Sequence, residues 1–178
     1  MAILDKKVGK IMTVLDKQEL VEYLITKHKD KFNGDKITPI KLQKGLYFLY
    51  AFWGGKIRSQ KLSSIDDIKE MTEMKFSYDE DLFDAEFEAW AYGPVDRGIY
   101  IWFKNLRNEE YDEIAQETLT GADSNVIGYI DNLIDKILNT NDFVLVDLSH
   151  EDKCWSSIYN PTKKNAMSNE AIKCEYAS

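Results

Sequence analysis

The residues best suited to acid–base chemistry or metal binding are the two histidines and two cysteines of the chain. His150 and Cys154 stand four positions apart, so on a helix they would share a face, with Glu151 and Asp152 between them in sequence. Such a pair could bind a metal ion or form a Cys–His nucleophile. However, a structural zinc site needs four ligands, and a nucleophile needs an orienting third group and an oxyanion hole. Because the sequence shows neither set, we predict that His150 caps or bridges a turn and that Cys154 is a small core residue.

Carboxylates and glycines give no stronger sign of catalysis. Glu86 and Glu88 would share one face of a strand with Trp90, but a glycosidase needs two carboxyl groups that flank a cleft, which spacing alone does not show. None of the nine glycines falls in the G-x-G-x-x-G or G-x-x-x-x-G-K patterns that bind phosphate. The sequence therefore predicts no catalytic residue, no metal, no cofactor and no enzymatic activity. A metal-independent hydrolase that uses Glu88 and His150 is the alternative within the enzymes.

The distribution of charge divides the chain into two regions. The 178 residues carry a net charge of −8, with +7 in residues 1–62 and −15 in residues 63–178. A net anion is poorly suited to bind nucleic acid or an acidic membrane, although the basic first region leaves room for a nucleic-acid-binding regulator. The densest acidic run is either a solvated face or a surface for a basic partner. Its members are Asp79, Glu80, Asp81, Asp84, Glu86 and Glu88.

Two further features bear on where the protein works. The longest apolar stretch without a charge, residues 45–55, is shorter than the roughly twenty residues needed to span a bilayer. Two cysteines are too few for a disulfide framework, which is typical of reduced compartments. We therefore expect a cytoplasmic protein without a signal peptide and without a membrane partner.

The elements that must position the candidate residues are mainly helices. Apolar periodicity predicts helices over residues 17–32, 39–53, 94–106, 109–117, 125–138 and 143–150, and a short exposed helix over residues 63–71. The helix from residue 39 is apolar on almost all sides and must be central to the core, with Lys41, Gln43 and Lys44 on its solvent side. Gly54-Gly55 is expected to end it, and for the first helix Asp16 is the expected N-cap and Asn33-Gly34 the expected stop. Residues 143–150 would also suit a strand, and we favour a helix.

A small antiparallel hairpin is expected beside the helices. Residues 74–77 and 85–92 look extended, and the second segment alternates apolar and polar residues. Gly93-Pro94 would then break the strand and begin the next helix. The predicted fold class is mainly α, a single compact helical domain with this small hairpin. Residues 1–15 would form an N-terminal arm, residues 16–160 the helical domain and residues 161–178 a C-terminal extension.

Three ordered blocks of sequence carry a resemblance to a known family. They are residues 38–48 (TPIKLQKGLYF), residues 87–95 (FEAWAYGPV), and residues 145–150 followed by Trp155. The blocks are similar to the KLQKLLYF, F-x-A-W-x-Y-G-P-V and L-x-x-L-T/S-H…W motifs of the Panacea domain family, the SocA-like antitoxins and phage-associated proteins. The resemblance covers roughly residues 17–160, and Gly45 stands where the family commonly has a larger apolar residue.

The resemblance implies a small cytoplasmic binding protein of bacteria, prophages or mobile elements. Such a protein would neutralise a toxin encoded beside it by direct contact, and a phage protein that acts on a host defence factor is an alternative. Polar groups that are hard to place in a core, and aromatics next to a rigid turn, are our candidates for a polar pocket or partner surface. These are Lys41, Lys44, Glu88, Trp90, Tyr92, Gly93, Pro94, His150 and Trp155. For Trp90, as for Phe87, we favour a place in the core over a partner surface, because aromatic residues on a strand are seldom free.

Overall fold

The computed structural model describes residues 12–66 and 80–177. Its elements in chain order are α1 (Lys17–Lys31), α2 (Pro39–Asp66), β1 (Phe87–Trp90), β2 (Gly93–Asp96), α3 (Arg97–Asn105), α4 (Asn108–Glu113), α5 (Ser124–Leu138), α6 (Asp142–Glu151), α7 (Lys153–Ser156) and α8 (Asn169–Tyr176). The described part of the chain is thus mainly α with one two-stranded antiparallel sheet, which confirms the predicted fold class. Within the same residues, no helix is both long and apolar enough to cross a bilayer.

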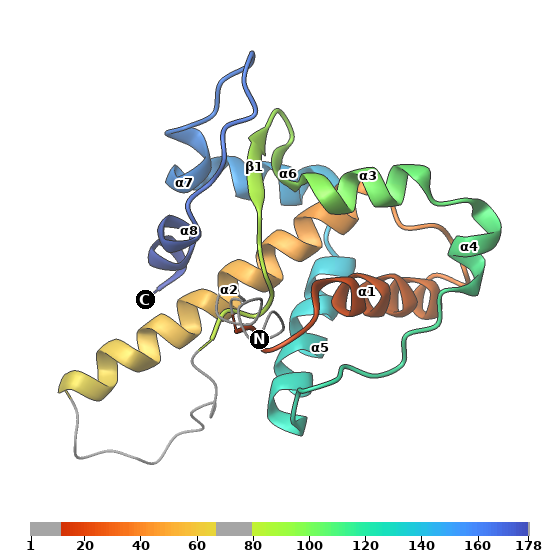
Figure 1. Ribbon diagram of the computed structural model, residues 1–178, viewed down its shortest axis with the longest axis horizontal. Helices are drawn as coiled ribbons and strands as arrows, with labels where there is room; N and C mark the ends of the chain where they lie inside the picture. Colours follow the sequence, from red (N-terminus) through yellow and green to blue (C-terminus); the bar gives the residue numbers. More distant parts are fainter. Residues whose placement is uncertain (1–11, 67–79, 178) are drawn as a thin grey trace, which may run out of the picture.

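Helix α2 is the central element of the fold. It crosses the molecule diagonally in Figure 1 and contacts α1, α3, α5, α6, α8 and strand β2. Its side chains Leu42, Leu46, Leu49 and Trp53 are fully buried among these neighbours. A helix surrounded in this way must be apolar on most of its faces, as the sequence predicts.

The prediction that Gly54-Gly55 ends this helix is wrong, because α2 continues to Asp66. A Cβ atom at Gly55 would overlap the backbone carbonyl of Tyr176, and one at Gly54 would overlap the side chain of Lys173. The two glycines therefore allow α8 to lie directly against α2. A glycine in a helix interior is destabilising by about 0.5–1 kcal/mol relative to alanine. The contact between α2 and α8 therefore outweighs the low helix propensity of the two glycines.

The hairpin differs from the predicted one. Strand β1 lies within the expected segment, but its partner is β2, with Phe87 opposite Asp96 and Trp90 opposite Gly93. Pro94 therefore lies in a strand and does not begin α3, which corrects the expected helix start. The Asp96 carboxylate instead caps α3 by accepting a hydrogen bond of 3.1 Å from the Ile99 backbone N–H.

Other helix boundaries follow local signals. Asp16 accepts a hydrogen bond of 2.9 Å from the Glu19 backbone N–H and caps α1 as expected. Asn33 and Gly34 adopt positive φ angles of 54° and 84° just after this helix, which confirms them as its stop. Residues 143–150 are helical in α6, and α4 ends at Glu113, four residues earlier than the predicted helix. The end of α2 takes up residues 63–66 of the helix expected over residues 63–71; the remainder of that segment, residues 74–77 and residues 1–11 of the arm lie outside the described residues.

Both ends of the described chain contact the core. Val14 and Leu15 are buried, and their backbone N–H groups donate to Asp81 O at 3.0 Å and Leu82 O at 2.8 Å. At the other end, α8 makes an extensive contact with α2 beside its C-terminal half (Figure 1). Ile172 of α8 is fully buried in this contact. Both ends of the described chain are thus packed against the rest of the fold.

Candidate functional site

Three side chains from different elements hold the backbone of the hairpin turn, residues 90–94. Trp155 Nε1 of α7 donates to Trp90 O at 3.0 Å, and His150 Nε2 of α6 lies 3.0 Å from Ala91 O. Lys44 Nζ of α2 donates to Pro94 O at 2.6 Å. We call these three contacts the turn clamp. It joins the three sequence blocks that stand far apart along the chain, because each block supplies one side of it.

Lys44 is the buried member of the turn clamp. Its side chain is 0% exposed, so the prediction that it marks a solvent side of α2 is wrong, and Lys41 and Gln43 are buried as well. Burial lowers the pKa of Lys44 to about 7, because water no longer stabilises the ammonium ion. No ion pair to Lys44 occurs among the described residues, and its hydrogen bond goes to a neutral carbonyl. This lysine is a structural support and is not accessible from the surface.

Gly93 is required by the same arrangement. Its φ angle is +95°, and a Cβ atom there would overlap Ser149 Oγ and lie 2.9 Å from Lys44 Cε. The glycine therefore lets the turn approach both α2 and α6. Any larger residue would push the turn away from the ammonium group that binds it.

His150 and Cys154 do not form a couple. The His150 ring stacks on Trp155 with centroids 4.1 Å apart, whereas the Cys154 sulfur lies 3.4 Å from the hydroxyl of Tyr47. Burial raises the pKa of the Cys154 thiol to about 12, so the reactive thiolate is disfavoured. Within residues 12–66 and 80–177, no three His, Cys, Asp or Glu side chains are grouped so that they could hold a metal ion.

Glu88 and Trp90 lie on the outer side of the hairpin. Glu88 accepts a hydrogen bond of 2.7 Å from Trp90 Nε1 and forms a salt bridge of 3.0 Å with Arg97. Although partial burial opposes it, these hydrogen bonds lower the pKa of Glu88. The half-buried Trp90 indole also contacts two cations, because Lys164 Nζ lies 4.1 Å and Arg97 Cζ 5.7 Å from its ring centroid. Glu88 is therefore held as a paired anion.

The structure places Lys41 away from the turn clamp. Its ammonium group donates to Thr140 O and forms a salt bridge of 3.2 Å with Asp142. It thereby closes the corner between α5 and α6. Of the predicted site residues, Lys44, Trp90, Tyr92, Gly93, Pro94, His150 and Trp155 meet at the hairpin turn, with Glu88 on its outer side.

The acidic run before the hairpin does not form one open surface. Asp81 accepts hydrogen bonds of 2.8 Å from the Tyr50 hydroxyl and 2.9 Å from Lys173 Nζ. It therefore anchors α8 to α2, whereas Asp84 and Glu86 are exposed. Asp79 lies outside the described residues.

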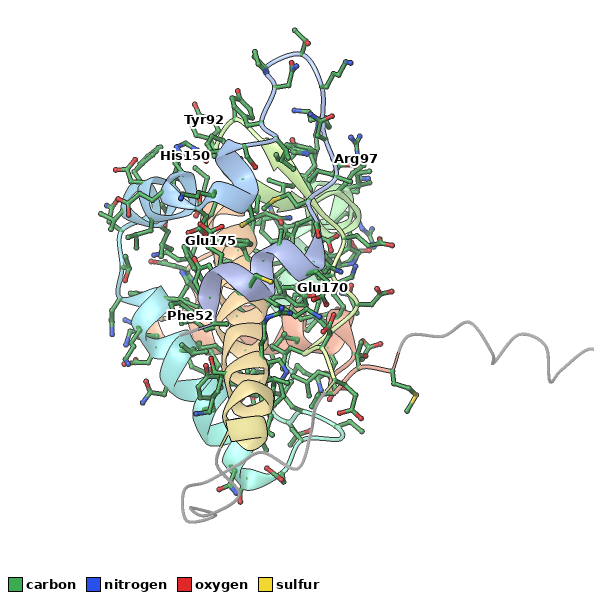
Figure 2. All side chains as sticks on the ribbon, turned by 90° about the vertical axis from the view of Figure 1, so that its left-hand side faces the viewer. Phe52, Tyr92, Arg97, His150, Glu170 and Glu175 are labelled. Atoms are coloured by element: carbon green, nitrogen blue, oxygen red, sulfur yellow. The ribbon has the colours of Figure 1, made fainter. Side chains whose placement is uncertain are left out.

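An exposed apolar surface on α6 was not predicted from the sequence. Tyr92 in the hairpin turn is 60% exposed and Phe143 is 58% exposed, and their ring centroids lie 6.5 Å apart. Val144 and Leu148 continue this exposed set along the helix. We call these four residues the α6 surface; Figure 2 shows Tyr92 at the end of the molecule where α6 meets the hairpin. A signal was present, because the FVLVDL segment is apolar on nearly all sides and a short helix at the edge of a fold buries only one.

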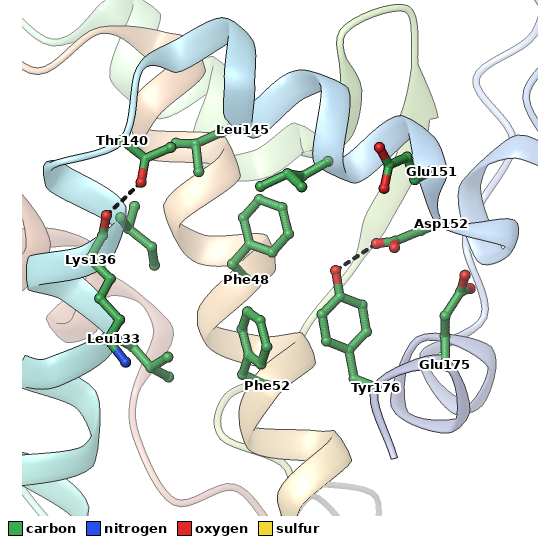
Figure 3. Close-up of a pocket in the computed structure, with 12 residues that line it drawn as sticks. Phe48, Phe52, Leu133, Lys136, Thr140, Leu145, Glu151, Asp152, Glu175 and Tyr176 are labelled. Carbon is green, nitrogen blue, oxygen red and sulfur yellow. Dashed lines mark hydrogen bonds between the residues drawn. The ribbon is translucent and has the colours of Figure 1, made fainter. Parts of the chain in front are cut away.

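A groove of about 590 Å³ adjoins this surface between α2, α5, α6 and α8 (Figure 3). Its apolar lining consists of Phe48, Phe52, Leu133, Ile137, Leu145, Leu148 and the ring of Tyr176. Lys136 and Thr140 lie on the α5 side, and three carboxylates, Glu151, Asp152 and Glu175, lie on the opposite side. We call this feature the α2–α8 groove.

Asp152 links the acidic side of the groove to the core. Its carboxylate accepts hydrogen bonds from the hydroxyls of Tyr47 at 2.5 Å and Tyr176 at 2.7 Å. Burial raises the pKa of Asp152, and the neighbouring Glu175 and Glu151 raise it further, while the two hydroxyls oppose the change. The tyrosines thus hold the acidic wall in place.

Comparison with known families identifies part of this architecture. Residues 74–156 match the family model described as Antitoxin SocA-like, Panacea domain. This stretch is therefore similar to the Panacea domain of SocA-like antitoxins. It contains the hairpin, α3, α4, α5, α6, most of the turn clamp and the whole α6 surface, whereas the block at residues 38–48 precedes it. Comparisons with curated proteins and with solved structures found no match.

Proposed function

We propose that the protein is an antitoxin-type binding module that neutralises a cognate toxin, encoded beside it, by direct protein contact. The observation that carries this proposal is the α6 surface, which lies inside the stretch that matches an antitoxin family. Exposed aromatic and aliphatic side chains in one patch are typical of protein–protein interfaces. Tyr92 and Phe143 would be the central contacts, because they are the large and exposed rings of the patch.

The turn clamp supports the same function in a different way. Lys44, His150 and Trp155 fix the backbone on each side of Tyr92, so its position is set before any partner binds. A surface that is already ordered loses less conformational entropy on association. In this proposal the clamp residues position the contact surface and Tyr92 touches the partner.

The arrangement of Glu88 and His150 favours binding over hydrolysis. A hydrolase would need both groups to face a common substrate site. Glu88 is instead paired with Arg97 on the outer side of the hairpin, and His150 is stacked on Trp155 beside Ala91 O. The two side chains thus have separate partners.

The test is co-expression of the chain with the protein encoded by the adjacent reading frame, scored by growth and co-purification. We expect Tyr92→Ala combined with Phe143→Ser to lose co-purification and protection, since interface aromatics each contribute about tenfold or more to affinity. Ile101→Ser is the matched control, because Ile101 is also an exposed aliphatic residue of the Panacea stretch but lies on α3. If no neighbour is toxic and no protein co-purifies with the wild type, the proposal is refuted.

A further inference from the structure

We infer that the α2–α8 groove binds an amphipathic helix of the partner protein that carries apolar residues on one face and lysine or arginine beside them. The inference rests on the proposed function and names the segment of the partner that the chain recognises. It concerns a second part of the surface, because the groove meets the α6 surface only at Leu148.

The apolar lining sets the first requirement on the occupant. Phe52 is 43% exposed although it lies in the central helix, and its ring contacts that of Tyr176 at a centroid distance of 4.9 Å. In Figure 3 the side chains of Phe48, Phe52 and Leu133 all face the groove. Removing such surface from water is favourable, so the occupant must present apolar side chains.

The volume and the walls define the shape of the occupant. The groove, of about 590 Å³, is large enough to take several side chains of the occupant. One helix presents such a row of side chains at positions i, i+3, i+4 and i+7. The lining comes from helices α2, α5, α6 and α8, and neither strand contributes to it. A peptide that binds as a β-strand needs a sheet edge for its backbone hydrogen bonds, whereas a helix satisfies its own.

Charge sets the last requirement. Glu151, Asp152 and Glu175 line the groove, against the single cation Lys136. Asp152 is bound by two tyrosines, and Glu175 accepts hydrogen bonds from the backbone N–H groups of Lys153 and Cys154. Within the described part of the chain, the carboxylate of Glu151 has no hydrogen-bond or ion-pair partner. A basic side chain of the occupant would form an ion pair with this carboxylate and speed association.

The direct test uses two synthetic helical peptides and the full chain. One peptide has leucine at positions i, i+3, i+4 and i+7 and lysine on its remaining face; in its twin, glutamate replaces every lysine. We expect the lysine peptide to bind at least about tenfold more tightly in fluorescence anisotropy. It should shift the methyl NMR signals of Leu133, Ile137 and Leu145. Equal binding of the two peptides, or shifts confined to other parts of the molecule, would overturn the inference.

Two variants provide a matched pair in this assay. Glu151→Lys should weaken binding of the lysine peptide by about fivefold, whereas Asp147→Lys, the same charge change at an exposed position of α6 outside the lining, should change it little. Phe52→Ser should weaken binding by about tenfold or more, with the melting temperature as a check on folding. If Asp147→Lys has the same effect as Glu151→Lys, general charge and not the groove is responsible.

The same variants separate this inference from the proposed function. If the toxin co-purifies equally well with Glu151→Lys, Phe52→Ser and the wild type, the groove inference fails while the antitoxin function stands. If the lysine peptide binds in the groove but no toxin is neutralised, the function fails and the groove preference stands. If the chain forms dimers that Phe52→Ser dissociates, or if a small molecule co-purifies in the groove, the helix is the wrong occupant.

Discussion

The hairpin turn and the α6 surface are adjacent, yet they are built in opposite ways. At the turn, polar side chains from three helices point inward and bind backbone carbonyls, and Lys44 is completely buried. On α6, apolar side chains point outward and are exposed. The polar residues that suggest chemistry in the sequence therefore support the structure, and ordinary apolar residues form the surface that we propose for partner contact. Substitutions that separate stability from binding test this difference.

The largest effect on stability is expected for Gly93→Val. The new side chain would overlap Ser149 Oγ, crowd Lys44 Cε and require a φ angle of +95° from a β-branched residue. We expect a loss of roughly 3 kcal/mol or more in the free energy of unfolding, measured by chemical denaturation. Gly128→Ala in α5 is the control, because a Cβ atom there meets nothing within 4 Å and should stabilise the helix by about 0.5–1 kcal/mol. Equal destabilisation by both changes would contradict the close approach at the turn.

Lys44→Met should change how stability depends on pH. The pKa of Lys44 is about 7 in the folded chain, compared with 10.5 for the free side chain, so between these values the unfolded chain binds more protons. Wild-type stability should therefore rise with pH in this window relative to the variant, by up to about 1.4 kcal/mol for each pH unit. Below pH 7 the methionine variant should be the more stable of the two, since it carries no buried charge.

Urea denaturation at several pH values from 6 to 10 measures this difference. Lys104→Met, which removes an exposed lysine from α3, is the control and should leave the pH dependence unchanged. A wild-type curve parallel to that of Lys44→Met would show that Lys44 keeps its proton in the folded chain.

Trp155→Phe should have a smaller effect. Phenylalanine can still stack on His150, but it removes the indole N–H that donates to Trp90 O. Loss of one partly buried hydrogen bond should cost about 1–2 kcal/mol, seen as a lower melting temperature. Binding of the partner should weaken as well, because the turn that carries Tyr92 becomes less ordered. A variant with lower stability but wild-type affinity would show that the turn clamp does not position Tyr92 for binding.

The smallest effect on stability is expected for Phe143→Ser. Phe143 is 58% exposed, so the free energy of unfolding should change by no more than about 0.5 kcal/mol. Partner binding should nevertheless fall by about tenfold or more, measured by co-purification and by titration. A large loss of stability would mean that this ring belongs to the core, and the contrast between the two regions would disappear.

Local signals determined much of the helical framework. The Asp16 cap, the Asn33-Gly34 stop and the amphipathic pattern of α5 each predict an element that the structure contains. Each signal depends on hydrogen bonds or side-chain contacts within a few residues along the chain, so the sequence carries it completely. Most of the predicted site residues lie together, because the three sequence blocks all reach the hairpin turn.

The tertiary structure decided the roles of those residues. Gly55 continues a helix because it lies against Tyr176, and Lys44 is buried because Pro94 and Gly93 cover it. Pro94 pairs in a strand because Asp96, and not the proline, caps the next helix. For Gly55 and Lys44, the residue that decides the outcome is far away in the sequence. For Pro94, the competing signal is the Asp96 cap, which is as local as the proline itself. Whether a residue is core, support or contact surface depends on which distant segments cover it, and that is fixed only when the helices pack around α2.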